Sequence, residues 1–163
     1  RWAEIIELAI NLEQAGDIIE HMLGKVQNLK ISKRRSFSDS GLDELSQLHT
    51  LLTANLGLGL SVFLSGDSHS ARQLLQQKRQ FRKLERELAH AHVHRLHQQV
   101  VESIETSAAH LELIADMKRL NSLFCSAAYA ALEGSGNGKQ RAAGETSTAR
   151  ETPTTEHLPG KPA

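Results

Sequence analysis

The sequence has few aromatic residues and a single cysteine. Aromatic side chains make up 4% of the 163 residues, and Cys125 has no second cysteine with which to form an internal disulfide. Leu, Ala, Gln, Glu, Arg and His instead dominate the first 133 residues, a composition that favours helices over strands. We therefore expect almost no strand, and a small core thiol that fits a reducing cytoplasm.

The sequence also lacks an excess of charge of either sign. Its 19 Lys and Arg balance 19 Asp and Glu, which gives a formal net charge of +0. This balance argues against a strongly basic nucleic-acid binder, so no nucleic-acid partner is predicted. Any attraction for anions has to come from a local patch, such as the basic residues between Lys78 and Arg86. That patch could meet anionic lipid headgroups or an acidic protein surface, or it is a solvated helix face.

No long hydrophobic run is present. The longest, Leu56 to Leu64, is interrupted by Gly57, Gly59 and Ser61. It is far shorter than the roughly 20 residues of a membrane-spanning helix, so these residues are predicted to span no membrane. No signal peptide is evident, and Arg1 falls inside a helical pattern without a cap, which we interpret as a fragment of a longer protein.

What the sequence does contain is helical periodicity. Apolar residues at alternating steps of three and four predict a first helix from the N-terminus to about Leu29, with a seam buried against other helices. Gly16 lies in this seam. Because glycine costs about 1 kcal/mol relative to alanine inside a helix, we expect Gly16 to permit a close approach of two helices. The seam comprises Trp2, Ile5, Ala9, Leu12, Gly16, Ile19, Leu23 and Val26.

The second predicted helix has clear start and stop signals. Ser38 is a suitable N-cap, with Phe37 and Leu42 placed to close a hydrophobic staple. Gly66 is suited to end the helix in the left-handed conformation. The expected buried face comprises Leu45, Leu48, Leu52, Leu56, Gly59 and Phe63.

Two further helices complete the predicted architecture. The third begins at Asp67 or Ser68 and breaks near Gln98, and the fourth runs from about Glu102 along a seam that reaches Ala131. From Gly134 onward periodic apolar residues disappear, so a disordered C-terminal tail is predicted. The fold class is therefore all-α, an antiparallel bundle of long helices.

Carboxylates provide the main candidate for chemistry. Glu13, Asp17 and Glu20 follow one another at i, i+4 and i+7 on the first helix. They could hold a hard or borderline cation together with groups on a facing helix, or they form a solvated acidic edge. Glu112 and Asp116 repeat the spacing on the fourth helix, which matters only if that pair faces Glu13 and Asp17.

Other constellations argue weakly for metal or catalysis. Glu87 and His90 have the Glu-x-x-His spacing of di-iron bundles, but no second copy is present. His90, His94 and His97 have zinc-like spacing on one helix, for which a solvated face is the favoured interpretation. The sequence has no nucleophile elbow and no phosphate-binding glycine loop, so it is not expected to be an enzyme.

Several segments together resemble a known family. The stretch Leu12–Glu20 is similar to the Glu-x-x-Gly-Asp helix of PhoU-type bundles. Further segments, in the same order and spacing, resemble the cytoplasmic C-terminal PhoU-like domain of bacterial sodium-dependent phosphate cotransporters, and the resemblance covers roughly Trp2 to Glu133. These segments are Phe37–Leu45, Leu48–His49, Asn55–Leu56, Lys78 with Arg82 and Glu85–Arg86, Glu102–Ser103, Thr106–Ser107, His110–Leu111 and Asp116–Ser122.

The resemblance implies a domain organisation and a function. Residues 1–35 would be the last helix of a preceding PhoU-like bundle, 36–133 a PhoU-like three-helix bundle, and 134–163 the tail. The chain would be a regulatory, non-catalytic domain that modulates phosphate import at the cytoplasmic face of the bacterial inner membrane. Its partners would be the membrane transport domain of the same polypeptide and its own copies. The alternatives are a free-standing PhoU-like regulator of phosphate signalling and a metal-binding bundle of the di-iron type.

The resemblance also bears on cofactors. PhoU proteins bind metal clusters through Glu-x-x-x-Asp motifs, which carries over to Glu13 and Asp17 as ligands of a divalent or iron-type metal. The corresponding positions on the fourth helix are Lys118 and Ser122, which cannot supply the same carboxylates. Whether phosphate itself contacts the domain is left open by the resemblance.

Overall fold

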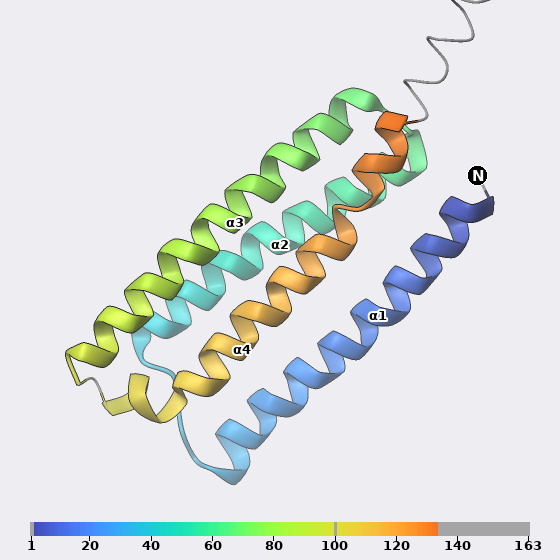
Figure 1. Cartoon of the computed structure of the whole chain (residues 1–163). Helices are drawn as coiled ribbons and strands as arrows, with labels where there is room; N and C mark the ends of the chain where they lie inside the picture. The colour runs from blue at the N-terminus through green and yellow to red at the C-terminus, as the bar shows by residue number, and fades with distance from the viewer. Residues whose placement is uncertain (1, 100, 134–163) are drawn as a thin grey trace, which may run out of the picture.

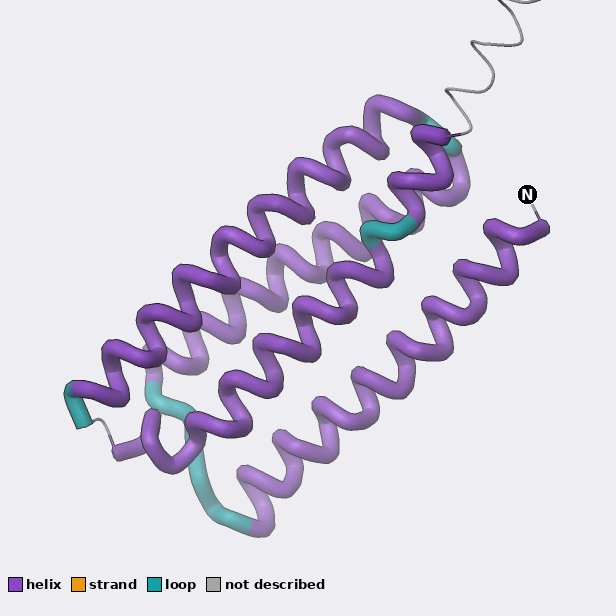
Figure 2. Tube along the Cα trace, viewed as in Figure 1, coloured by secondary structure: helices purple, strands orange, loops and turns teal. Residues whose placement is uncertain are grey.

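The computed structural model describes residues 2–99 and 101–133, and these residues form helices and short connections without a strand, as predicted (Figures 1 and 2). After a turn at Cys125 and Ser126 the chain is helical again over 127–133. The predicted tail, 134–163, lies outside the described residues. The named elements are α1 (Trp2–Gln27), the π-helical η1 (Asn28–Ser32), α2 (Asp39–Ser65), α3 (Ser68–His97) and α4 (Val101–Phe124).

The helices alternate in direction and form a three-helix bundle with one additional helix. In Figure 1, α2, α3 and α4 pack around a common core, and α1 lies along the outer side of α4. α1 has α4 as its main neighbour, whereas α2, α3 and α4 all pack extensively on one another. The additional helix is therefore attached to the bundle along one side.

Capping explains why the turns fall where the sequence predicts them. Ser38 Oγ accepts a hydrogen bond from the Gly41 amide at 3.2 Å, and Gly66 ends α2 at φ 65°. The Asp67 carboxylate accepts from the amides of His69 and Ser70 and so caps α3. Each device satisfies backbone groups that the first or last helical turn leaves without a partner.

The predicted hydrophobic staple is wrong. Leu42 is 47% exposed, while Phe37 is buried in a cluster with Leu29 and Leu113. The residues packed against this cluster are Met22, Val26, Leu45 and Ala109, so α2 contributes Leu45 to it in place of Leu42.

The bundle interior follows the central part of the face predicted for α2, since Leu48, Leu52 and Gly59 are buried while Leu45, Leu56 and Phe63 are half-buried. Leu48 and Leu52 from α2 pack with Phe81 from α3 and Met117 from α4 in the larger core cluster. A second cluster lies where α2 ends and α3 begins, and it contains Cys125. Burial raises the pKa of the Cys125 thiol to about 11. This thiol is therefore protonated and shielded, as expected for a structural cysteine.

The predicted seam of α1 is largely wrong within the described chain. Trp2 is 81% exposed, Leu23 64% and Leu12 45%, and a Cβ on Gly16 would meet no atom within 4 Å. The side of α1 that packs against the bundle instead carries Ala15 and Ile18. The helix has apolar residues on two faces, and periodicity alone does not decide which face has a neighbour.

The close helix approach that was expected at Gly16 occurs at Gly59. A Cβ added to Gly59 would lie 2.6 Å from the carbonyl oxygen of Phe124. Only a glycine allows the backbones of α2 and α4 to come this near.

α2 is the one helix of residues 2–99 and 101–133 that is long and apolar enough to cross a membrane on length and composition. It contains no long uninterrupted apolar run because glycine, serine and threonine lie among its leucines. In the structure α2 places Glu44 and Asn55 in the bundle interior, where Asn55 Nδ2 donates to Asn121 Oδ1 at 2.7 Å. These features are those of a core helix.

A pair of glycine substitutions tests this packing. Gly59→Ala should destabilise the fold by about 1 to 3 kcal/mol because the new methyl group overlaps the backbone of α4. Gly16→Ala should leave stability unchanged or raise it by up to about 1 kcal/mol, since alanine is the better helix former. Urea unfolding followed by circular dichroism measures both, and equal effects of the two substitutions would contradict the packing described here.

Candidate functional site

α2 and α4 begin and α3 ends at the same end of the bundle (Figure 1). A buried polar cluster lies among these three helices near that end. It contains Glu44 from α2, His92 and Arg95 from α3, and His110 from α4. We call these four residues the Glu44 cluster. Charged side chains are rarely buried unless they are paired, so each member requires a partner.

Glu44 connects the three helices. The Arg95 guanidinium donates to both carboxylate oxygens of Glu44, with an Nη2–Oε2 distance of 2.6 Å, and the two side chains are only 13% and 8% exposed. His110 Nε2 lies 3.1 Å from Glu44 Oε2. One carboxylate thus contacts both α3 and α4, and the two-pronged arrangement fixes its orientation.

The two imidazoles stack beside the ion pair. The His92 and His110 rings are parallel within 7°, with centroids 4.6 Å apart, and Phe37 meets His110 edge-on. The Ser107 hydroxyl lies 2.9 Å from His92 Nε2. Gly41 lies between the N-cap of α2 and the stack, since a Cβ there would lie 3.2 Å from Ser38 Oγ and 3.4 Å from His110 Nδ1.

The environment keeps both imidazoles neutral. Burial lowers the pKa of His110 to about 4, and the neighbouring His92 and Arg95 act in the same direction against Glu44. Burial and the charge of Arg95 likewise lower the pKa of His92. Neutral, enclosed rings beside a paired carboxylate hold helices together, which is the role that the geometry supports.

This cluster was not predicted from the sequence, where the spacing of His90, His94 and His97 is the more obvious pattern, and those three residues are exposed. A usable signal was nevertheless present. Glu44 lies one turn before Leu48, and His92 lies one turn after Leu88, so both polar residues occupy apolar seam positions. A charged residue in a seam indicates either a buried pair or a misassigned seam.

The predicted metal ligands Glu13 and Asp17 lie one turn apart on α1 and are exposed, as is Glu20. Within residues 2–99 and 101–133, no three His, Cys, Asp or Glu side chains are arranged to hold a metal ion. Among these residues Glu13 and Asp17 thus have no third His, Cys, Asp or Glu side chain in place to share a metal ion with them. The metal site stays a prediction.

The second acidic pair does not face the first. Glu112 Oε2 and Asp116 Oδ2 lie 3.0 and 3.1 Å from the ammonium nitrogen of Lys25 on α1. Desolvation acts to lower the pKa of Lys25, but the hydrogen bonds to the two carboxylates outweigh it and raise that pKa above 10.5. Glu112 and Asp116 thus serve as the anchor of α1 on α4.

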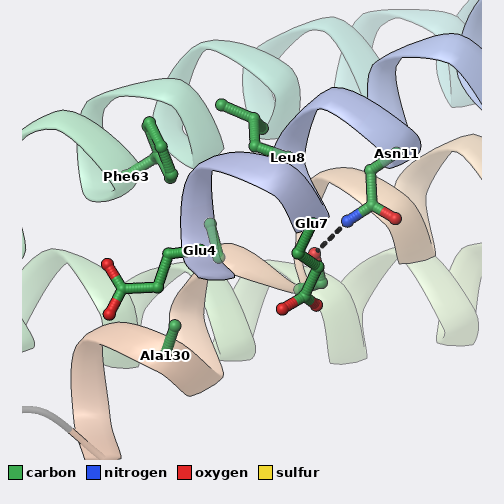
Figure 3. A pocket seen from close by; sticks show the side chains of 8 residues that line it. Glu4, Glu7, Leu8, Asn11, Phe63 and Ala130 are labelled. Atoms are coloured by element: carbon green, nitrogen blue, oxygen red, sulfur yellow. Dashed lines mark hydrogen bonds between the residues drawn. The ribbon is translucent and has the colours of Figure 1, made fainter. Parts of the chain in front are cut away.

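A second polar tie holds the N-terminal half of α1. Figure 3 shows the small cavity between α1, α2 and the segment after α4, where Asn11 Nδ2 donates to Ser126 Oγ at 2.9 Å. Glu4, Glu7 and Phe63 also line it. Its volume of about 20 Å³ has room for little more than one water molecule, so it is not a ligand site.

The relatives found by comparison with known proteins share one name. The chain is 59% identical over 133 residues to "Putative inorganic phosphate export protein YjbB" of Salmonella typhimurium. It is 57% identical to the proteins of the same name from Escherichia coli K12 and Shigella flexneri. The matches cover 82% of this chain and 24% of each relative, so the chain spans about a quarter of their length. No family model and no solved structure matches the chain.

The ion pair of the Glu44 cluster can be tested by removing one charge. Glu44→Gln leaves Arg95 buried without its counterion, so we expect a loss of about 3 to 5 kcal/mol in the free energy of unfolding. The control is Glu87→Gln, which breaks the exposed pair with Lys83 and should cost no more than about 1 kcal/mol. Urea unfolding compares the variants, and a similar small loss in both would contradict the account of the cluster.

The neutral imidazoles predict a pH dependence of stability. His110 binds a proton near pH 6.5 when unfolded but only near pH 4 when folded, so the unfolded state takes up protons first as the pH falls. The melting temperature should therefore decrease between pH 6.5 and 4.

Two histidine variants isolate the contribution of His110. His110→Gln should reduce the decrease in melting temperature on acidification, whereas His94→Gln, at an exposed position of α3, should retain it in full. Thermal scans at several pH values measure the slopes. An unchanged slope in His110→Gln would show that another group causes the dependence.

Proposed function

We propose that the chain is a non-catalytic regulatory domain of a bacterial phosphate transport protein, at the cytoplasmic face of the inner membrane. The observation that carries the proposal is the 57 to 59% identity to proteins named for inorganic phosphate export. That name gives export as the direction of transport, and we adopt it in place of the import expected from the resemblance to sodium-dependent cotransporters.

The length of the relatives supports a domain over a free-standing regulator. The chain matches 24% of each relative, which leaves about three quarters of those proteins for a membrane part that would carry the phosphate. In this proposal sodium and phosphate move through that part, and the helical bundle modulates it. The bundle itself has no catalytic role.

The exposed seam of α1 supports the proposed division into residues 1–35 and 36–133. α1 packs mainly on α4, and further apolar residues of this helix, including Leu12, Ile19 and Leu23, remain exposed. Apolar stripes of this length are usually covered in a mature protein. We propose that helices of a preceding PhoU-like bundle in the same polypeptide cover the seam, with Gly16 at the closest approach.

The reading frame around the chain gives a direct test. Hydrophobic membrane-spanning segments should be encoded in the same frame as this chain. A frame without them would contradict the transporter proposal and favour the free-standing PhoU-like regulator.

Phosphate flux tests regulation through the seam. In the complete polypeptide, Leu12→Glu with Leu23→Glu should change the rate of phosphate release from loaded cells, because charges would separate α1 from its cover. In the isolated 163-residue chain the same substitutions should alter stability by no more than about 0.5 kcal/mol each, since both side chains are exposed there.

His21→Glu is the control for this experiment, since His21 is an exposed polar position of the same helix outside the seam. It should leave the flux unchanged. Equal flux in the seam variant and in the control, at equal protein levels, would contradict regulation through α1.

A further inference from the structure

A groove between α3 and α4 carries a concentration of positive charge. Its volume is about 440 Å³, and it is lined by Arg79, Arg82, Glu85 and Arg86 from α3 and by Lys118 from α4. Four cationic side chains thus surround one carboxylate in a chain whose formal net charge is +0. We propose that this groove binds a phosphate group.

The three arginines lie on one side of α3. Arg79, Arg82 and Arg86 are spaced at i, i+3 and i+7, and residues three or four apart lie about 5 to 6 Å from one another on a helix surface. All three are exposed, and within residues 2–99 and 101–133 none of them has a hydrogen bond or an ion pair. Their guanidinium groups are therefore available to an anion.

The neighbouring charges are already engaged. Lys83 pairs with Glu87 at 3.7 Å, Lys78 lies over the Tyr129 ring at 5.2 Å, and Arg119 lies 3.8 Å from Asp116. Glu85, the carboxylate of the groove, lies 3.1 Å from Lys118 Nζ. Lys118 thus offsets the charge that would repel an anion, and the three arginines remain as the excess.

The chemistry of the groove favours phosphate over a carboxylate. A guanidinium group presents planar pairs of donors that match two oxygens of a phosphate or a carboxylate. A carboxylate has only two oxygens, whereas the tetrahedral phosphate group can be shared among several guanidinium groups. The spacing of Arg82 and Arg86 across one helical turn suits this sharing.

The phosphate group could belong to inorganic phosphate or to a phospholipid headgroup. The choice of inorganic phosphate as the first probe rests on the proposed function, while the site rests on the arginines alone. A domain that binds the transported anion could adjust transport to its concentration. A domain that binds headgroups would instead be oriented on the membrane surface.

Binding is tested on the complete 163-residue chain by calorimetric titration with sodium phosphate at constant ionic strength. A second arm measures sedimentation with phosphatidylcholine vesicles that do or do not contain phosphatidic acid. Saturable binding of free phosphate identifies inorganic phosphate as the source, and binding only to phosphatidic acid vesicles identifies the headgroup. Either result supports the groove if it depends on the arginines.

The double variant Arg82→Gln with Arg86→Gln tests whether binding depends on the arginines. Loss of each charge-assisted contact should weaken binding by about tenfold or more, with the melting temperature unchanged because both side chains are exposed. The matched control is Arg72→Gln, on the same helix outside the groove, where the guanidinium donates to Ser68 Oγ. It should bind as the wild type does.

Absence of binding to both probes would overturn the proposal, as would equal binding by the double variant and the wild type. Neither outcome would change the conclusion of the flux experiment. Binding is measured on the isolated chain, whereas phosphate flux is measured on the complete polypeptide. Failure of this site and failure of the regulatory proposal are therefore distinguishable.

Discussion

A buried carboxylate that must find its counterions constrains the whole bundle. Glu44 is 6% exposed and meets Arg95 of α3 and His110 of α4, so the start of α2 can take only one register against the other two helices. Apolar contacts among Leu48, Phe81 and Met117 supply most of the interior, but apolar side chains tolerate small shifts. A two-pronged ion pair does not, because a shift leaves charges buried and unpaired.

The helices, their caps and the centre of the buried face of α2 were predictable from the sequence because each depends on local chemistry. Ser38 caps α2 through its own side chain and Gly66 ends it through its left-handed backbone, so both act on groups of the same helix. Leu48 and Leu52 of α2 lie one turn apart on the face that is buried. The buried side of α1 and the surroundings of Gly16 were not predictable within this chain. α1 has two apolar faces, and periodicity does not show which of them packs against another helix. The close approach at Gly59 depends on the position of Phe124, far away in the sequence.

The residues of the candidate site were likewise predictable where they share a helix and not predictable where packing brings two helices together. Acidic pairs can be found by spacing, but their partners cannot, and so Glu112 and Asp116 turned out to bind Lys25. His92 and His110 are separated by a helix break and meet only through the packing of α3 on α4. Residues of one helix, such as Arg79, Arg82 and Arg86, are brought together by helical geometry alone, but the groove beside them requires Lys118 from α4.

The attachment of α1 has a mechanical consequence. Its 26 residues make a rod of about 39 Å at about 1.5 Å per residue, joined to the rest of the chain near one end by Lys25 and in its N-terminal half by Asn11. A rod fixed at two separated points cannot pivot freely, so a force on its outer face is passed to α4 as a whole. α4 also carries Lys118 of the arginine-lined groove, so the helix that receives this force belongs to the lining of the groove.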